Sequence, residues 1–139
     1  VGPLTGSWAG HYDILSVYIF YQPDGANVTG VIYNSDNSTN YNGATTSSSW
    51  TSERSSDIGV NTSNFNYTHM WIYNHADKRK LYYIDTTTDT GVGSAPGLFQ
   101  SWGQWENTTS SISSLSVVER NTGNAQDAKI DSHLVILGL

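Results

Sequence analysis

Hydrophobic and aromatic residues occur along the chain in short runs that are separated by polar, turn-forming residues. No stretch keeps apolar positions at the three- and four-residue spacing of an amphipathic helix. The runs are rich in Val, Ile, Tyr, Trp and Thr, which favour β-strands. The pattern predicts strands over Ile14–Tyr21, Asn27–Tyr33, Asp57–Thr62, Thr68–Tyr73, Lys80–Asp85, Ser114–Arg120 and Lys129–Leu137. We therefore expect a single all-β domain over residues 1–139.

Turns and long polar segments connect these runs. Gln22–Gly25 and His75–Lys78 have the composition of hairpin turns, and the charged cluster Asp77–Lys80 is expected to lie in solvent. Ser35–Ser49 and Thr86–Gly97 are long for loops of a compact domain. They are expected to contain a functional site or a short strand that the pattern does not reveal.

An internal repeat is the most informative feature of the pattern. Landmarks in the first half recur in the same order 51 to 53 positions later. The aligned pairs are Tyr18–Asp24 with Trp71–Asp77, Val31–Asn34 with Tyr82–Asp85, and Trp50 with Trp102. The predicted units are residues 8–50 and 51–105, with a partial third unit over 106–139. Four-stranded units of this length suit the blades of a β-propeller.

The first unit contains an aromatic residue, Ile and two aromatic residues, followed by Gln-x-Asp-Gly, a returning strand, a loop and a Trp. This run resembles the blades of fungal fucose-binding propeller lectins. The matching stretches are Val17–Gly25 with Trp50 and Ser56–Asp85 with Trp102. The resemblance implies a β-propeller fold and sugar binding. Because the smallest propellers have about four blades, it also implies a homo-oligomer or a longer parent chain.

The polar part of the family's sugar site has no counterpart in this chain. In that family, an Arg on the outgoing strand and a Glu on the returning strand accompany an aromatic residue. The Arg positions hold Tyr18 and Trp71, and the Glu positions hold Gly30 and Tyr83. Recognition of fucose therefore does not follow from the resemblance.

A second resemblance lies at the N-terminus. Leu4–Trp8, followed by Asp24-Gly25 and Val28–Gly30, is similar to the opening hairpin of avidin-like barrels. The Trp-Gly-Gln segment that such barrels carry in a middle strand falls too late here, at Ser101–Gln104. A small β-barrel or a β-sandwich is the alternative fold.

Composition and charge narrow the range of partners. The net charge is −6, and 13% of the residues are charged. Nucleic acids and anionic membrane surfaces require a broad basic surface, so neither is expected as a partner. No apolar run approaches the roughly 20 residues of a membrane-spanning helix, so no membrane insertion is expected.

The cellular location is predicted from composition and from glycosylation motifs. Ser, Thr and Asn make up about a third of the chain, and five Asn residues begin N-glycosylation motifs: Asn27, Asn37, Asn61, Asn66 and Asn107. Chance would give about three such motifs in this composition. These features favour a secreted or cell-surface protein, and the absence of a signal peptide at Val1 suggests a mature form or a fragment.

Two groups of residues have the chemistry of a sugar site, which needs an aromatic face and polar side chains at its edge. The first group is Trp50, Glu53 and Arg54, and the second is Trp102, Gln104, Trp105 and Glu106. Trp50 and Trp102 could instead be core residues. We expect Trp105 and Glu106 to be the better candidates for an exposed site, on opposite sides of one strand.

Catalysis, cofactors and metal sites find little support in the sequence. No pair of Glu residues is marked as a glycosidase pair, and neither a Gly-x-Ser-x-Gly elbow nor a Cys is present. The i, i+2 pairs of His and Asp at residues 11/13, 75/77 and 131/133 lack an identifiable third metal ligand. We expect a secreted, non-catalytic, lectin-like protein that binds glycans. The alternative is an extracellular structural glycoprotein whose subunits assemble through β-edges, with Lys129–Leu137 either fully buried or paired with another chain.

Overall fold

The computed structural model describes residues 5–9, 11–23, 29–59, 64–120, 128–129 and 131–139. Every regular element in these residues is a β-strand. The strands are β1 (Thr5–Ser7), β2 (Ile14–Tyr21), β3 (Thr29–Tyr33), β4 (Tyr41–Thr45), β5 (Ser49–Glu53), β6 (Ser56–Asp57), β7 (Asn66–Tyr73), β8 (Lys80–Thr88), β9 (Gly97–Trp105), β10 (Ser114–Glu119) and β11 (His133–Gly138). In this part of the chain, no helix has the length and apolar character required to cross a membrane. The predicted all-β character is confirmed.

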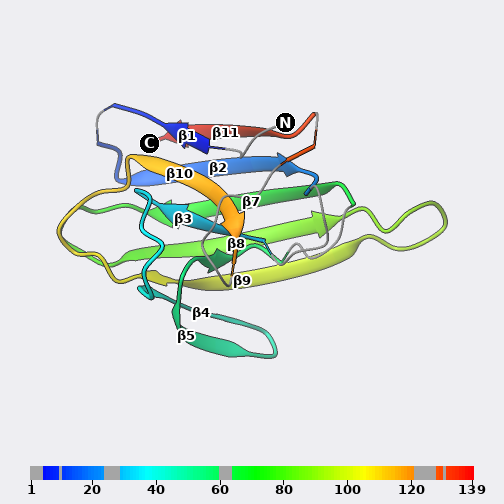
Figure 1. Ribbon diagram of the computed structural model, residues 1–139, viewed down its shortest axis with the longest axis horizontal. Helices are drawn as coiled ribbons and strands as arrows, with labels where there is room; N and C mark the ends of the chain where they lie inside the picture. The colour runs from blue at the N-terminus through cyan, green and yellow to red at the C-terminus, as the bar shows by residue number, and fades with distance from the viewer. Residues whose placement is uncertain (1–4, 10, 24–28, 60–63, 121–127, 130) are drawn as a thin grey trace.

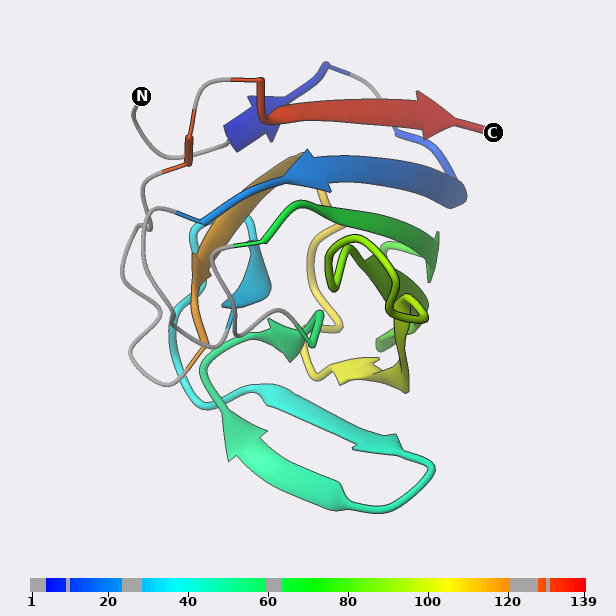
Figure 2. The same ribbon diagram turned by 90° about the vertical axis from the view of Figure 1, so that its right-hand side faces the viewer.

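The strands form two antiparallel sheets that are not closed into a barrel. The larger sheet has the order β11-β2-β7-β8-β9-β4-β5, and the smaller has the order β1-β10-β3-β6. Figure 1 shows the smaller sheet lying across one face of the larger. The β4–β5 hairpin projects beyond the rest of the molecule at the end of the larger sheet (Figure 2).

The core lies between the two sheets and follows the period-two alternation of strand side chains. On β7, the alternate residues Thr68, Met70 and Ile72 are buried, while the residues between them are more exposed. The smaller sheet contributes Val31, Tyr33, Leu115 and Val117 from β3 and β10. One face of the larger sheet is thereby covered, and its opposite face is left to solvent.

Most predicted strands are confirmed, and four strands were missed. The prediction over Ile14–Tyr21 coincides with β2, while those for β3, β7, β8, β10 and β11 overlap the observed strands with shifted ends. The predicted strand Asp57–Thr62 shares only Asp57 with β6, and its last three residues lie outside the described residues. The missed strands are β1, β4, β5 and β9. Two of them, β4 and the start of β5, lie in the polar segment Ser35–Ser49, where we expected either a site or a hidden strand.

The first predicted hairpin is wrong. β2 pairs with β11 and β7 in the larger sheet, whereas β3 pairs with β10 and β6 in the smaller one. The connection after Gln22 therefore passes from one sheet to the other. The second hairpin is confirmed, because β7 and β8 pair along their whole length.

Successive blade-like units are not seen in this arrangement. Strands from all three predicted units, 8–50, 51–105 and 106–139, contribute to the seven-stranded sheet. In addition, β5 crosses the predicted boundary between residues 50 and 51. The repeat of about 52 residues therefore stays a hypothesis about sequence, whereas the fold is a pair of packed antiparallel sheets.

Candidate functional site

The uncovered face of the larger sheet, here called the outer face, is rich in aromatic side chains. On β7, β8 and β9, the residues that point away from the core include Trp71, Tyr83 and Trp102, with 44%, 40% and 43% of their surface exposed. Large apolar side chains grouped on one solvent-facing surface are typical of binding sites. Further members of this face are Tyr18, Phe20, Tyr67, His69, Tyr73 and Leu81.

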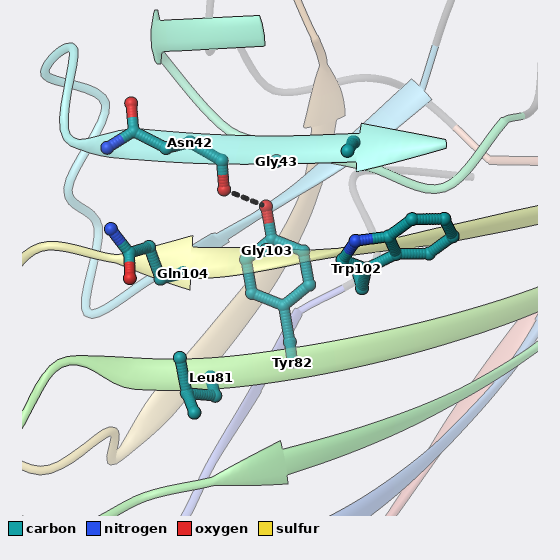
Figure 3. Close-up of a pocket in the computed structure, with 8 residues that line it drawn as sticks. Asn42, Gly43, Leu81, Tyr82, Trp102, Gly103 and Gln104 are labelled. Carbon is teal, nitrogen blue, oxygen red and sulfur yellow. Dashed lines mark hydrogen bonds between the residues drawn. The ribbon is translucent and has the colours of Figure 1, made fainter. Parts of the chain in front are cut away.

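A depression of about 460 Å³ lies in the outer face where β8, β9 and β4 run side by side (Figure 3). Trp102, Leu81 and Ala44 supply apolar walls, and the amides of Asn42 and Gln104 lie among them. Gly43, Gly103 and Tyr82 complete its lining. A concave apolar surface with a few polar groups has the features of a small-ligand site.

The absence of a side chain at Gly103 leaves room for an aromatic ring beneath the depression. Gly103 of β9 pairs with Gly43 of β4 on one side and with Tyr82 of β8 on the other. The Tyr82 ring lies across Gly103, and its hydroxyl donates a hydrogen bond to the carbonyl oxygen of Asn42 over 3.1 Å (Figure 3). A side chain at Gly103 would collide with this ring and this carbonyl. Tyr82 therefore holds β4 in place through its contact with Asn42.

A carboxylate fixes the orientation of the polar side chains in the depression. Glu106 accepts hydrogen bonds from the amide nitrogens of Asn42 (2.7 Å) and Gln104 (2.5 Å), and it pairs with Arg79. Because a carboxylate only accepts, both amides must present their nitrogens to it. The side-chain oxygen of Asn42 accepts the backbone N–H of Ser52, whereas that of Gln104 has no partner among the described residues. Gln104 can therefore accept a hydrogen bond from a ligand.

Trp105 supports the site from the core and does not line it. We expected an exposed side chain at Trp105, and this is wrong, because only 1% of its surface is exposed. Its indole packs against Tyr41 and Tyr33 with ring centroids 6.4 and 5.6 Å apart, and its N–H donates to Asp36 over 2.7 Å. Since Trp105 follows Gln104 and Tyr41 precedes Asn42, this packing holds both amides of the depression.

Asp36 belongs to the same support. Its carboxylate accepts hydrogen bonds from Ser38, Trp105 and Asn40. Burial alone would raise the pKa of Asp36, but these hydrogen bonds stabilise the charged form and together hold the pKa below its usual value. Asp36 is therefore ionised at neutral pH and accepts from the Trp105 indole.

The structure does not bring the side chains of Trp50, Glu53 and Arg54 together into one exposed group. Trp50 lies against Gly43 on the core side of β4, so the strand separates it from the depression. Arg120 lies over the Trp50 ring at 4.8 Å and pairs with Glu53 and with Asp57. Burial raises the pKa of Asp57, and Arg120 counteracts part of this rise. Arg54 instead donates to the carbonyl oxygen of Asn37. The cation that closes this cluster, Arg120, was missed because it is distant in sequence.

The glycosylation motifs differ in how they are placed. Asn37 is exposed and Asn107 is half-buried, so both are accessible. Asn66 is 1% exposed, and its amide nitrogen donates to the carbonyl oxygens of Tyr21 and Asn64. A glycan on Asn66 would have to replace both hydrogen bonds, so the expectation of glycosylation there does not fit this fold. Asn27 and Asn61 lie outside the described residues.

The His and Asp pairs form no metal site in the part of the chain that the structure describes. His11 is hydrogen-bonded to Asp13 at 2.8 Å, and His75 pairs with Asp77. Both pairs are solvent-exposed. His133 bonds to the backbone carbonyl of Asp131 instead of its carboxylate.

Part of the depression could be predicted from the sequence. Trp102, Gln104 and Glu106 were expected at a sugar site, and the structure brings them together. Asn42 was missed because β4 was not recognised as a strand, and Leu81 was missed because its partners are set by strand pairing. The alternation of Tyr67, His69, Trp71 and Tyr73 with smaller residues could have placed an aromatic face on β7.

Comparison of the chain with protein-family models, with curated proteins and with solved structures gives no significant match. The function is therefore inferred from the geometry of the site itself. The site consists of the depression at Trp102, its oriented amides and the exposed aromatic residues around it.

Proposed function

We propose that this chain is an extracellular, non-catalytic carbohydrate-binding protein and that the depression at Trp102 holds a sugar ring. The observation that carries the proposal is the exposed Trp102 indole next to the amides of Asn42 and Gln104. A pyranose has an apolar face of C–H groups and an edge of hydroxyls. The indole matches the face, and the amides match the edge.

Burial and charge of the site support a neutral sugar. The walls are mostly apolar, while the one carboxylate that bonds to the lining amides, Glu106, is neutralised by Arg79. The free oxygen of Gln104 can accept from a hydroxyl, and the second amide hydrogen of Asn42 can donate to one. An uncharged polyhydroxylated ligand matches this set better than an anion.

The arrangement of polar groups favours binding over catalysis. Glycoside hydrolysis requires two carboxyl groups across the scissile bond, and Glu106 is occupied by three partners. Ser16 and His69 form a hydrogen-bonded pair at 3.0 Å elsewhere on the outer face. However, Ser16 is buried between the paired strands β11 and β7, where backbone N–H groups are used in the sheet and cannot stabilise an oxyanion.

The proposal is tested by comparing the wild type with Trp102→Ala on a broad glycan array, followed by calorimetry with the sugars that bind. We expect the substitution to weaken binding at least about tenfold, or roughly 1.4 kcal/mol, because the stacking surface is lost. Leu98→Ala is the matched control, since Leu98 is exposed on the same strand and the same face but lies outside the depression. It should bind as the wild type does.

Two results would contradict the proposal. One is the absence of binding by the wild type to every glycan on the array. The other is binding that Trp102→Ala leaves unchanged, because the sugar would then sit elsewhere on the molecule.

A second candidate function, an extracellular subunit that assembles through β-edges, rests on β11. In the described part of the chain, β11 pairs with β2 alone, and Val135 and Leu137 are 41% and 49% exposed. An apolar edge strand with one free side is a template for pairing with another chain. The expectation that Lys129–Leu137 is fully buried is wrong, and pairing with a second copy stays a prediction.

A further inference from the structure

The depression at Trp102 is one end of a line of aromatic side chains on the outer face. Trp102 of β9 is paired in register with Tyr83 of β8, and Tyr83 is paired with Trp71 of β7. All three side chains point away from the core, and each has about two-fifths of its surface exposed. We call these three residues the aromatic row. The row runs across the strands.

A row of polar side chains runs parallel to the aromatic row. His69, Asp85 and Gln100 are likewise in register on β7, β8 and β9. Each lies two residues away from the member of the aromatic row on its own strand. Gln100 donates to Asp85 over 2.7 Å and to the Tyr83 hydroxyl over 2.9 Å. The polar groups are thus fixed along one edge of the aromatic row, while Leu81, Gln104 and Asn42 line its other edge near Trp102.

From this arrangement we infer that the outer face binds an extended, neutral, β-linked polysaccharide chain, with one sugar ring at each member of the aromatic row. This inference rests on the proposed function, because the ring at Trp102 is the sugar of the depression. Adjacent strands are about 4.8 Å apart, which is close to the length of one pyranose residue in an extended β-linked chain. Three consecutive rings would therefore meet Trp102, Tyr83 and Trp71 in turn.

Charge favours this ligand over an anionic glycan. Asp85 lies in the middle of the polar row, and the whole chain carries a net charge of −6. A sulfated or carboxylated polysaccharide would be repelled. A second copy of the chain is a weaker match as the occupant, because a copy related by twofold symmetry would bring polar rows with like charges onto the same face.

The inference is tested by calorimetry of the wild type with a length series from glucose to cellohexaose, and with matching xylo- and chito-oligosaccharides. We expect affinity to rise at least about tenfold from the monosaccharide to the trisaccharide and to change less than about threefold beyond it. Trp71→Ala should lower the affinity for the trisaccharide about tenfold and leave the affinity for the monosaccharide unchanged. Tyr67→Ala is the control, because Tyr67 is exposed on the same strand outside the aromatic row.

The outcomes separate this inference from the proposed function. Affinity that does not depend on chain length, but is still lost in Trp102→Ala, would overturn the aromatic row and leave the sugar site intact. Binding restricted to short branched or α-linked glycans would do the same. The absence of any sugar binding would overturn both. Light scattering gives a further check, since a multimer of the wild type that Trp71→Ala converts to a monomer would make the aromatic row an interface between copies.

Discussion

At the scale of single residues, the shape of the depression depends on aromatic side chains that are almost fully buried, Tyr82 and Trp105. Tyr82 reaches from β8 across Gly103 to the backbone of Asn42, and Trp105, which follows Gln104, packs against Tyr41 and Tyr33 in the core. These buried rings hold β4 and β9 side by side, and the proposed stacking of a sugar on the exposed indole of Trp102 depends on that arrangement. Close packing of this kind tolerates little added volume.

Gly103→Ala is predicted to destabilise the protein, because the added methyl group would collide with the Tyr82 hydroxyl and the Asn42 carbonyl oxygen. We expect a loss of about 1–3 kcal/mol in the free energy of unfolding, measured by urea denaturation. Gly97→Ala is the matched control, because Gly97 lies on the same strand and its added methyl group would meet its nearest atom at 3.5 Å, an ordinary contact. Equal stability of the two variants would show that β4 is not held in this way.

At the scale of elements, the β7–β8 turn is held by a residue that the sequence placed in solvent. Lys80 was expected to be solvated within the charged cluster Asp77–Lys80, and this is wrong, since its side chain is fully buried. Its ammonium group donates to the carbonyl oxygens of Ala76, Lys78 and Asn107 and lies 5.7 Å from the Trp105 ring centroid. Burial lowers the pKa of Lys80.

Lys80→Met is predicted to destabilise the fold by roughly 1–3 kcal/mol, because three carbonyl oxygens would lose their donor while the volume of the side chain is nearly kept. Thermal or urea unfolding measures this effect. Lys78→Met provides the comparison, because the Lys78 side chain is exposed and lies only two residues away in the sequence. A change at Lys80 no larger than at Lys78 would contradict a role for Lys80 in holding the turn.

The strands also differ in how well they could be predicted from the sequence. Strands with a dense run of Val, Ile and aromatic residues, such as β2 and β7, were found because their side chains fill one face of a sheet. β9 was missed, although it is nine residues long, since Gly, Gln and Ser interrupt its apolar pattern. Those interruptions have physical causes in the fold: Gly103 makes room for Tyr82, and Ser101 donates to the carbonyl oxygen of Asp57.

The pairing between strands that are distant in the chain could not be predicted from the sequence for a related reason. Trp102 and Gln104 could be named from their local chemistry, but Asn42 and Leu81 reach them only through the order β8-β9-β4. Two hairpins with similar local patterns were predicted, yet only β7 and β8 pair with each other. The local pattern of residues indicates a strand and its two faces. Which strand pairs with it depends on contacts between residues that are far apart in the sequence.

At the scale of the whole molecule, the outer face and the β11 edge belong to the same sheet but favour different partners. The outer face combines aromatic rings with fixed polar groups, which suits a sugar. The β11 edge offers a backbone with one free side and apolar side chains, which suits another strand. Val135 and Leu137 lie on the side of the outer face, but β2 separates β11 from the aromatic row. The free backbone of β11 can therefore pair with another strand while the aromatic row stays accessible.

Val135→Lys is predicted to prevent assembly through β11 while sugar binding is retained. If two copies pair along this strand, native mass spectrometry of the wild type will show dimers whose fraction rises with concentration. A lysine on an edge strand opposes such pairing because its charge would be desolvated in the continuous sheet. We therefore expect the variant to be monomeric at concentrations where the wild type is dimeric. Val92→Lys is the control, because this substitution adds the same charge at a position that is fully exposed and away from the sheet edges. A wild type that stays monomeric at every concentration would eliminate the assembly function, and dimers that survive in Val135→Lys would place the interface elsewhere.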